Sequence, residues 1–331
     1  LTRALEVVRR SHVALRTRLQ TREGEIEQVV DRDPTGSILE VRECPDSDDA
    51  LTSAVEATRS SLSPTVAPWK AVLLRHGATH HTFVFCAHRT VWDETSTAIL
   101  GRELSALYGN DGDAETARRA DPAPGSFGTG DREPAPGGAR RLAAALGDAP
   151  PLHGFPLKAP RPRLVSVAAG AVSTRLRADS LRLLESSGDD WGVEPFMILV
   201  AGSAYVLAQY CGQRRIVIGM PFSLRDPSAD RPALGSHTAL LPLAFEAHPD
   251  STLETLARDL DAARRAASHD AGTPFHQIVV ETGSRIDPAA NPLFQIACAR
   301  DVPLVLSLGS CASRPRDGAP PARLRELVCL R

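Results

Sequence analysis

Helix-like and strand-like segments alternate through both halves of the 331-residue chain, and this alternation restricts the fold to the α/β class. The longest apolar stretch, Pro195 to Tyr210 (PFMILVAGSAYVLAQY), is interrupted by Gly, Ser and Gln. It is shorter than the roughly 20 residues of a membrane span, so it predicts a core helix. No internal repeat is visible, but similar elements recur in both halves. We therefore expect an α/β pseudo-dimer of two lobes.

Spacing of the apolar residues sets the expected elements. Helical patterns cover residues 1–20, 48–62, 95–108, 180–187, 195–210 and 252–268. Strand-like runs cover residues 25–30, 38–41, 69–75, 81–86, 164–176, 215–232 with a charged ending, 240–245, 293–299, 304–308 and 324–330.

A stretch rich in Gly and Pro separates the two halves. Between Gly109 and Arg140, 11 of 32 residues are Gly or Pro, mixed with charged residues, which predicts a flexible linker from about residue 109. We place the lobe boundary near its end, which gives an N-terminal lobe over 1–150 and a C-terminal lobe over 151–331.

Charge and cysteine content narrow the class of partner and the compartment. The chain has 38 Lys and Arg against 40 Asp and Glu, a formal charge of −2. Its net charge therefore gives no overall attraction to nucleic acid or to an anionic membrane. The six cysteines contain no C-x-x-C pair, and no secretory leader is recognisable. These features predict reduced thiols and a cytoplasmic location.

Four segments, in this order, carry a family resemblance. They are SHVALRT at 11–17, HRTVWDE at 88–94, IGMPFSLR at 218–225 followed by LGSHTALLPL at 234–243, and NPLFQ at 291–295. They resemble the R-H-x-x-L-R-T, H-H-x-x-x-D-G, I-G-x-P-x-x-x-R with G-F-x-x-N-T-L-P-L, and R-N-P-L-F-Q motifs of the condensation-domain family of nonribosomal peptide synthetases. The resemblance implies a chloramphenicol-acetyltransferase-like fold, in which two lobes form a V and the loop at 88–94 lies in the tunnel between them.

Two departures from the family pattern affect the chemistry. Arg89 stands where amide-forming members have the second His, which contacts the attacking amine. A guanidinium has five donors, no acceptor and a permanent charge, so it cannot take a proton from an amine. Glu94 replaces the family Gly; it adds bulk, suits the start of a helix and could pair with Arg89. No catalytic residue is therefore expected in the degenerate motif His88, Arg89, Asp93 and Glu94.

The remaining motif residues are given structural roles by the resemblance. Asp93 and Arg225 occupy the positions of a scaffold ion pair, and His88 that of a residue packed under the loop. On the tunnel side, His237 stands at an aromatic position and Ala239 replaces the family Asn. His237 could supply a missing base, although a polar loop residue is the simpler interpretation.

The HR-x-x-x-D-acidic form of the motif resembles the X domain of synthetases that assemble glycopeptide antibiotics. That resemblance implies a domain that recruits haem-thiolate cytochrome monooxygenases, which crosslink aromatic side chains of a peptide held on the neighbouring peptidyl carrier domain. We expect no cofactor in this domain itself; phosphopantetheine would belong to the carrier domain and haem to the oxygenase.

Other candidate sites are weaker. Lys158, Arg161 and Arg163 form a short basic cluster that could bind a partner. His80 and His81 have no third ligand at suitable spacing, so no metal site is expected. Two alternatives to recruitment stay open: an active condensation or epimerisation domain in which another group replaces the base, and a structural spacer without a further partner.

Overall fold

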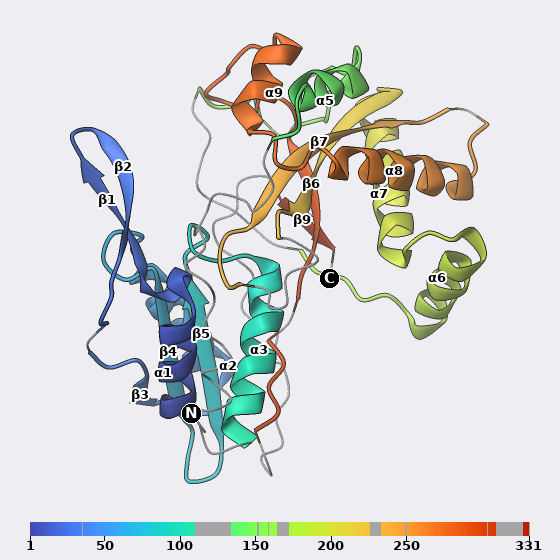
Figure 1. Cartoon of the computed structure of the whole chain (residues 1–331). Coiled ribbons are helices and arrows are strands. Elements are labelled where there is room, and N and C mark those ends of the chain that lie inside the picture. Colours follow the sequence, from blue (N-terminus) through green and yellow to red (C-terminus); the bar gives the residue numbers. More distant parts are fainter. Residues whose placement is uncertain are drawn as a thin grey trace. The chain divides into compact units, whose positions relative to one another are not determined.

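The chain divides into two compact units in the computed structural model (Figure 1). The structure describes residues 1–34, 36–109, 134–150, 152–157, 159–163, 172–225, 233–248, 250–302 and 304–308, and the backbone of 327–330. Unit 1 comprises Leu1–Asp131, Arg225–His237 and Val302–Ala319; unit 2 comprises Arg132–Leu224, Thr238–Asp301 and Pro320–Arg331. The expected division at residue 150 is therefore corrected, because two later segments belong to unit 1 and residues 132–150 to unit 2.

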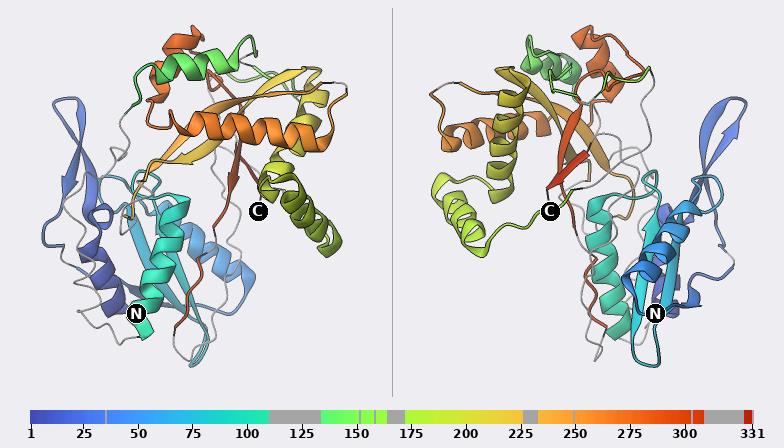
Figure 2. Two further views of the ribbon diagram at one scale, coloured as in Figure 1. Left: turned by 45° about the vertical axis from the view of Figure 1, so that its right-hand side comes forward. Right: turned by 180° about the vertical axis from the view of Figure 1, so that it is seen from behind.

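Unit 1 is a small sheet with helices on both faces (Figure 2). Its elements are α1 (Thr2–Ser11), the 3-10 helix η1 (Val13–Arg16), β1 (Thr17–Arg22), β2 (Glu25–Val30), β3 (Glu40–Glu43), α2 (Asp48–Ser60), β4 (Trp69–Arg75), β5 (His81–Ala87) and α3 (Glu94–Gly109). The sheet has the order β3-β4-β5, parallel then antiparallel. Alternate residues of β4 face opposite ways, so Val72 and Leu74 pack towards α2 while Ala71 joins the core of α1 and α3.

The N-terminal helix is shorter than its apolar pattern predicts. It ends at Ser11, where His12 is extended with φ −116° and ψ 117°. The expected helix over 1–20 is wrong beyond that point, because Leu15 lies in η1 and Leu19 in β1. Residues 17–22 instead pair with 25–30 in an antiparallel hairpin. Glu23 and Gly24, both with positive φ, form the two-residue turn that such a hairpin requires.

Unit 2 is built around a four-stranded sheet of order β7-β6-β8-β9. Its elements are α5 (Gly138–Leu146), α6 (Ala178–Trp191), α7 (Pro195–Cys211), β6 (Arg215–Ser223), β7 (Thr238–Glu246), α8 (Leu253–Ser268), α9 (Phe275–Thr282), β8 (Ile296–Arg300) and β9 (Leu327–Leu330). The prediction of a core helix over 195–210 is confirmed, because Met197, Ile198, Val200, Ala201 and Ala204 of α7 are almost fully buried. None of the helices in the described ranges could by itself cross a membrane; α6 and α7 pass on length and composition together, but they are bent by 103°.

Several expected elements differ from the structure. Helices α5 and α9 were not expected, and the described residues 304–308 form no strand. Of the expected strand over 164–176, residues 172–176 are not a strand, and the rest lies outside the described residues. Residues 110–133 of the expected linker also lie outside the described residues. Strand β8 begins only at Ile296 because the Asn291 side chain accepts hydrogen bonds from the backbone N–H groups of Leu293 and Phe294, which fold into a turn.

Two of the family-like segments meet inside unit 2. Strand β6 pairs in parallel with β8 at Gly219 and Ala297, and the ring of Phe294 covers the bare Cα of Gly219. A Cβ on Gly219 would lie 2.5 Å from that ring. The glycine of IGMPFSLR is thus needed for close packing of the aromatic residue of NPLFQ.

Gly219→Ala is expected to destabilise the protein by about 1–3 kcal/mol, because the added methyl group overpacks a filled core. Urea unfolding of unit 2 would measure the change. Gly202→Ala in α7 is the matched control, since its Cβ would come no closer than 3.7 Å to a neighbour; it should be neutral or stabilise by up to about 1 kcal/mol. Equal effects of the two substitutions would contradict the packing role of Gly219.

Candidate functional site

The loop over residues 88–94 joins β5 to α3 inside unit 1. Its backbone is fixed at both ends, because His88 N–H donates to Pro68 O at 2.6 Å and Val91 N–H donates to His88 O at 3.0 Å. Trp92 packs against Phe85, with ring centroids 4.8 Å apart, and Phe85 stacks on Trp69. The loop is therefore a tightly seated turn.

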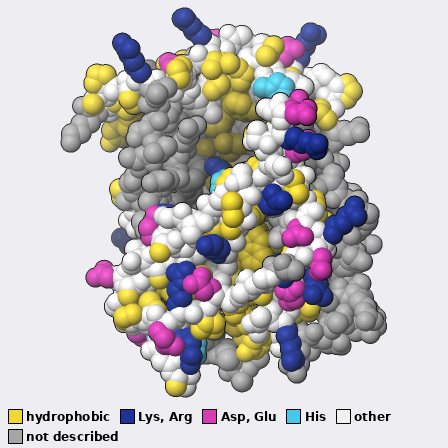
Figure 3. All heavy atoms as spheres, turned by 90° about the vertical axis from the view of Figure 1, so that its left-hand side faces the viewer, with side chains coloured by type: hydrophobic (Ala, Val, Ile, Leu, Met, Phe, Trp, Pro, Cys, Tyr) yellow, Lys and Arg dark blue, Asp and Glu magenta, His cyan; other side chains and the backbone are white. Residues whose placement is uncertain are grey.

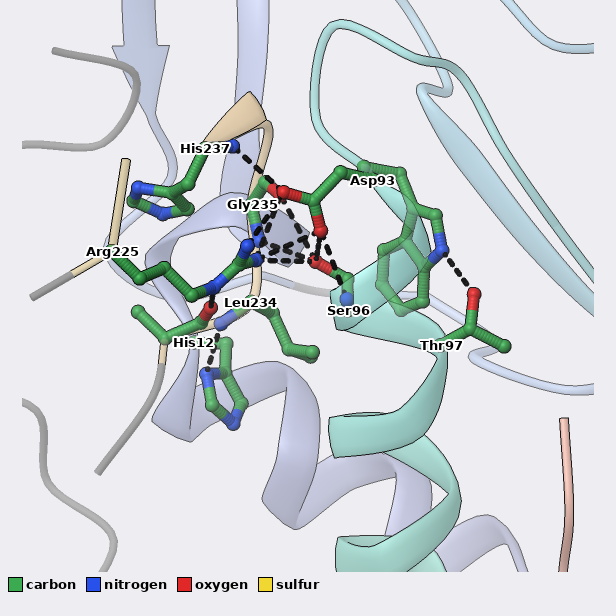
Figure 4. A network of polar contacts seen from close by, with 10 residues as sticks. His12, Asp93, Ser96, Thr97, Arg225, Leu234, Gly235 and His237 are labelled. Carbon is green, nitrogen blue, oxygen red and sulfur yellow. Dashed lines mark hydrogen bonds and ion pairs between the residues drawn. The ribbon is translucent and has the colours of Figure 1, made fainter. Parts of the chain in front are cut away.

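Asp93 ends this loop and anchors the site. Its Oδ1 accepts from the backbone N–H of Ser96 at 2.9 Å, so Asp93 caps the first turn of α3. The ion pair that the resemblance implies is present and bidentate: Arg225 Nη1 lies 2.6 Å from Oδ2, and Nη2 lies 2.9 Å from Oδ1. Both side chains are buried, at 3% and 8% exposure. Figure 4 shows Asp93 and Arg225 facing each other.

The pair also fixes the segment over 233–237, which belongs to unit 1 although it follows β6 in the sequence. Arg225 Nε donates to Ala233 O at 3.0 Å, and Gly235 N–H donates to Ser96 Oγ at 3.0 Å. His237 N–H donates to Asp93 Oδ2 at 2.9 Å. Each backbone group named here thereby has a hydrogen-bond partner, as buried polar groups normally do.

His12 is a member of this network that sequence reasoning missed. Leu234 N–H donates to His12 Nδ1 at 3.3 Å, so His12 Nε2 carries the proton and donates to Glu103 Oε2 at 2.7 Å. The imidazole thus links the end of α1 to α3 and to Leu234, whose side chain is buried in the unit 1 core (Figure 4). The only available signal was the position of His12 in SHVALRT.

The charged form of Asp93 is favoured although the residue is buried. Burial by itself raises the pKa of the carboxyl, but the hydrogen bonds and charge of Arg225 and the donors of Ser96 outweigh it. The pKa of Asp93 is consequently lowered from its ordinary value.

The side chain of His88 is held by hydrogen bonds within its own loop. Thr90 N–H lies 3.3 Å and Thr90 Oγ1 lies 2.8 Å from His88 Nδ1. Because a backbone N–H can only donate, Nδ1 is the acceptor and Nε2 carries the proton of the neutral ring. Burial and the charge of Arg89 lower the pKa of His88, which keeps the ring neutral near pH 7. In this tautomer the basic nitrogen, Nδ1, is occupied by Thr90, and Nε2 is a donor.

Arg89 and Glu94 do not join the buried network. Both side chains are exposed, and within the described part of the chain no ion pair joins them, so the expected pairing of Arg89 with Glu94 is wrong. Glu94 lies in the first turn of α3, where its charge suits the helix dipole, as expected.

Of the other predicted site residues that the structure describes, only His237 joins the Asp93 network, through its backbone N–H. His237 is buried in unit 1, and its ring extends away from Asp93 in Figure 4; Ala239 lies in β7 of unit 2. Arg161 and Arg163 belong to unit 2, and Lys158 lies outside the described residues. The tunnel roles of His237 and Ala239 stay predictions.

His76 and His80 are engaged with neighbouring residues and form no metal site. His76 uses both ring nitrogens, on Cys44 O and Thr82 Oγ1, and His80 contacts Asp46. No group of three or more His, Cys, Asp or Glu residues suited to a metal ion occurs in the described ranges. On the face drawn in Figure 3, Lys and Arg side chains are interspersed with Asp and Glu.

Comparisons with known proteins agree on one family. The family model described as "Condensation domain" matches residues 1–121 and 145–302. Tyrocidine synthase 3 of Brevibacillus parabrevis is 26% identical over 223 residues, which cover 67% of this chain and 3% of that protein. Bacitracin synthase 1 of Bacillus licheniformis is 25% identical over 295 residues, which cover 86% and 5%. The chain therefore spans no more than about one twentieth of the length of these relatives.

Solved structures share the fold. The crystal structure of the X-domain from teicoplanin biosynthesis has a TM-score of 0.75 at 20% identity, covering 98% of this chain and 75% of that chain. For the complex of the X-domain and OxyB from teicoplanin biosynthesis the TM-score is 0.69, at 21% identity and with 98% and 74% covered. The first condensation domain of the CDA synthetase gives 0.65 at 17% identity, with 90% and 72% covered. The expected α/β fold class, chloramphenicol-acetyltransferase-like, is confirmed.

Arg225→Met is expected to destabilise unit 1 by about 3–5 kcal/mol, because it leaves the Asp93 carboxylate buried without its counter-ion. Arg75→Met is the matched control, since Arg75 pairs with Glu43 at 3.4 Å on the surface; it should cost about 0–1 kcal/mol. Chemical unfolding of both variants measures the difference. A loss from Arg225→Met no larger than that of the control would contradict the scaffold role.

The Asp93 pair also predicts a pH dependence. Because the folded-state pKa lies below the unfolded value of about 3.9, the stabilisation is complete above that value and is lost as the pH falls through the folded pKa. The free energy of unfolding should therefore exceed that of Asp93→Asn, which keeps the cap, by an amount that shrinks below about pH 4. A difference that stays constant down to acid unfolding would contradict this.

Proposed function

Because the chain belongs to the condensation-domain family, we propose that it is a condensation-like domain of a nonribosomal peptide synthetase that forms no amide bonds and instead recruits haem-thiolate cytochrome monooxygenases to a carrier-bound peptide. The observation that carries this proposal is Arg89, at the position where the motif of amide-forming members has its second His. Its guanidinium is exposed, permanently charged and without an acceptor, so it cannot deprotonate an attacking amine.

The surrounding residues support the loss of chemistry. His88 has its acceptor nitrogen engaged by Thr90, and its pKa is lowered, which makes it a weaker base than an ordinary histidine. General acid–base catalysis contributes roughly 10²- to 10⁴-fold, and without it amide formation would be slow. Asp93 and Arg225, which do no proton transfer, keep their bidentate geometry. The scaffold is thus retained although the base is missing.

Recruitment of a partner oxygenase is a function that the domain could perform without a base. It is supported by the HR-x-x-x-D-acidic form of the motif and by the likeness to the X-domain, which is solved in complex with OxyB. The peptide would be attached to the phosphopantetheine arm of a neighbouring peptidyl carrier domain, and the partner oxygenase would supply the haem. Its product would be a crosslinked peptide of the glycopeptide antibiotic class.

The second candidate is an active condensation or epimerisation domain. It is favoured by the relatives in sequence, which are named as synthases of tyrocidine and bacitracin and are 26% and 25% identical to this chain. It requires a proton acceptor from another residue, such as His237. A spacer without a partner is the third possibility.

An assay with donor and acceptor carrier proteins separates these functions. The wild-type domain should form no peptide bond while it forms a complex with a haem-thiolate monooxygenase, detected by co-elution and by the haem absorbance. A condensation domain with an intact H-H-x-x-x-D-G motif is the positive control. Peptide formation that Arg89→Ala abolishes would support the active enzyme and contradict the proposal. Absence of both peptide formation and oxygenase binding would favour the spacer.

A further inference from the structure

The exposed face of α7 lacks the charges that a solvent-facing helix surface normally carries. None of the 17 residues of α7 is Asp, Glu, Lys or Arg. One side is buried in the unit 2 core, but Tyr205, Val206 and Tyr210 on the other side are 37%, 50% and 66% exposed. A surface helix usually places charged residues opposite its apolar stripe. The uncharged outer face therefore indicates a surface that is covered in the working assembly.

A second element extends this face. The segment over 152–157 lies against the end of α7, where the Gln213 side chain accepts from Gly154 N–H at 3.1 Å and donates to Leu152 O at 3.2 Å. Gly154 is close to Cys211 O, since a Cβ there would come within 2.9 Å of that oxygen. The backbone of this segment is thus fixed to α7.

The fixed segment places Phe155 beside Tyr210. Their ring centroids are 6.1 Å apart with 34° between the planes, and both rings are more than a third exposed. We call the exposed apolar side chains of the segment and of the end of α7 the aromatic patch; it consists of Leu152, Phe155, Leu157, Val206 and Tyr210. Aromatic residues on a fixed backbone are the residue type that dominates protein interfaces.

The charged residues that follow the segment over 152–157 in the sequence, up to residue 163, have one sign. Residues 149–163 contain Lys158, Arg161 and Arg163 but no Asp or Glu. The pKa of His153, in this segment, is lowered by burial and also by the charge of Arg161. An acidic partner surface would be attracted here, and a second copy of this chain, with the same basic residues, would be repelled.

We propose that the aromatic patch is the docking surface for the recruited monooxygenase, which would contact it through an apolar side chain flanked by acidic ones. This inference rests on the proposed function and specifies where the partner binds. A protein is favoured over a lipid surface because three basic residues fall short of the clusters of 4–8 Lys and Arg typical of anionic lipid recognition. Arg161 and Arg163 then act at the rim, where guanidinium groups can bind carboxylates in pairs of hydrogen bonds.

Binding of a haem-thiolate monooxygenase to immobilised domain tests the proposal. Phe155→Ser with Tyr210→Ser should weaken binding by about tenfold or more, as loss of a central aromatic anchor does. Arg161→Glu with Arg163→Glu should weaken it by about tenfold at low salt and less at high salt. Arg285→Glu and Ile286→Ser, which change an exposed basic and an exposed apolar residue of the same unit, are the matched controls and should leave the affinity within about twofold.

The binding results distinguish a wrong docking surface from a wrong proposal of oxygenase recruitment. If the wild-type domain binds and the aromatic and basic variants bind equally well, the aromatic patch is not the docking surface, although recruitment stands. If the wild-type domain binds no oxygenase, both the docking surface and the proposed recruitment are contradicted. Self-association or binding to anionic vesicles that the aromatic variants abolish would also overturn the proposal. The variants should unfold at the same temperature as the wild type. Weaker binding then reflects the changed surface and not a loss of folding.

Discussion

The buried pair of Asp93 and Arg225 is the interaction on which unit 1 depends. It joins residues 132 positions apart, caps α3 and fixes the segment over 233–237 through Ser96 and His237. A buried ion pair adds little net stability compared with apolar residues, but removal of one partner is costly. Its value here is geometric, because the hydrogen bonds around the carboxylate allow one position for the loop over 88–94.

This scaffold is physically separate from the chemistry that the family performs. Asp93 and Arg225, which position the loop, are buried and bonded, whereas Arg89, at the position where amide-forming members have a His, is exposed and joins none of these bonds. His88 is turned so that Thr90 occupies its acceptor nitrogen. The residue at position 89 can therefore differ without loss of the loop, because none of the hydrogen bonds that fix the loop passes through that position.

Sequence patterns predicted correctly those elements that are apolar over most of their length. Strand β4 and helix α7 were placed correctly because a run of apolar residues over their whole length reports their burial. The family resemblance supplied the Asp93–Arg225 pair, which no spacing rule could have given. Helix α1 was overextended because its apolar stripe continues past Ser11, while the chain turns at His12 to bond Leu234, 222 residues away. The Gly219–Phe294 contact was missed for the same reason, since residues far apart in the chain determine it.

The state of His88 is the most direct test of a motif that keeps its scaffold and lacks a base. Imidazole nitrogen chemical shifts, recorded by NMR across a pH titration, report which ring nitrogen carries the proton and the pKa of the ring. We predict a neutral ring at pH 7 with the proton on Nε2 and a pKa below the ordinary value of 6.5. A proton on Nδ1, with Nε2 free to accept, would restore a base to the loop and contradict the account.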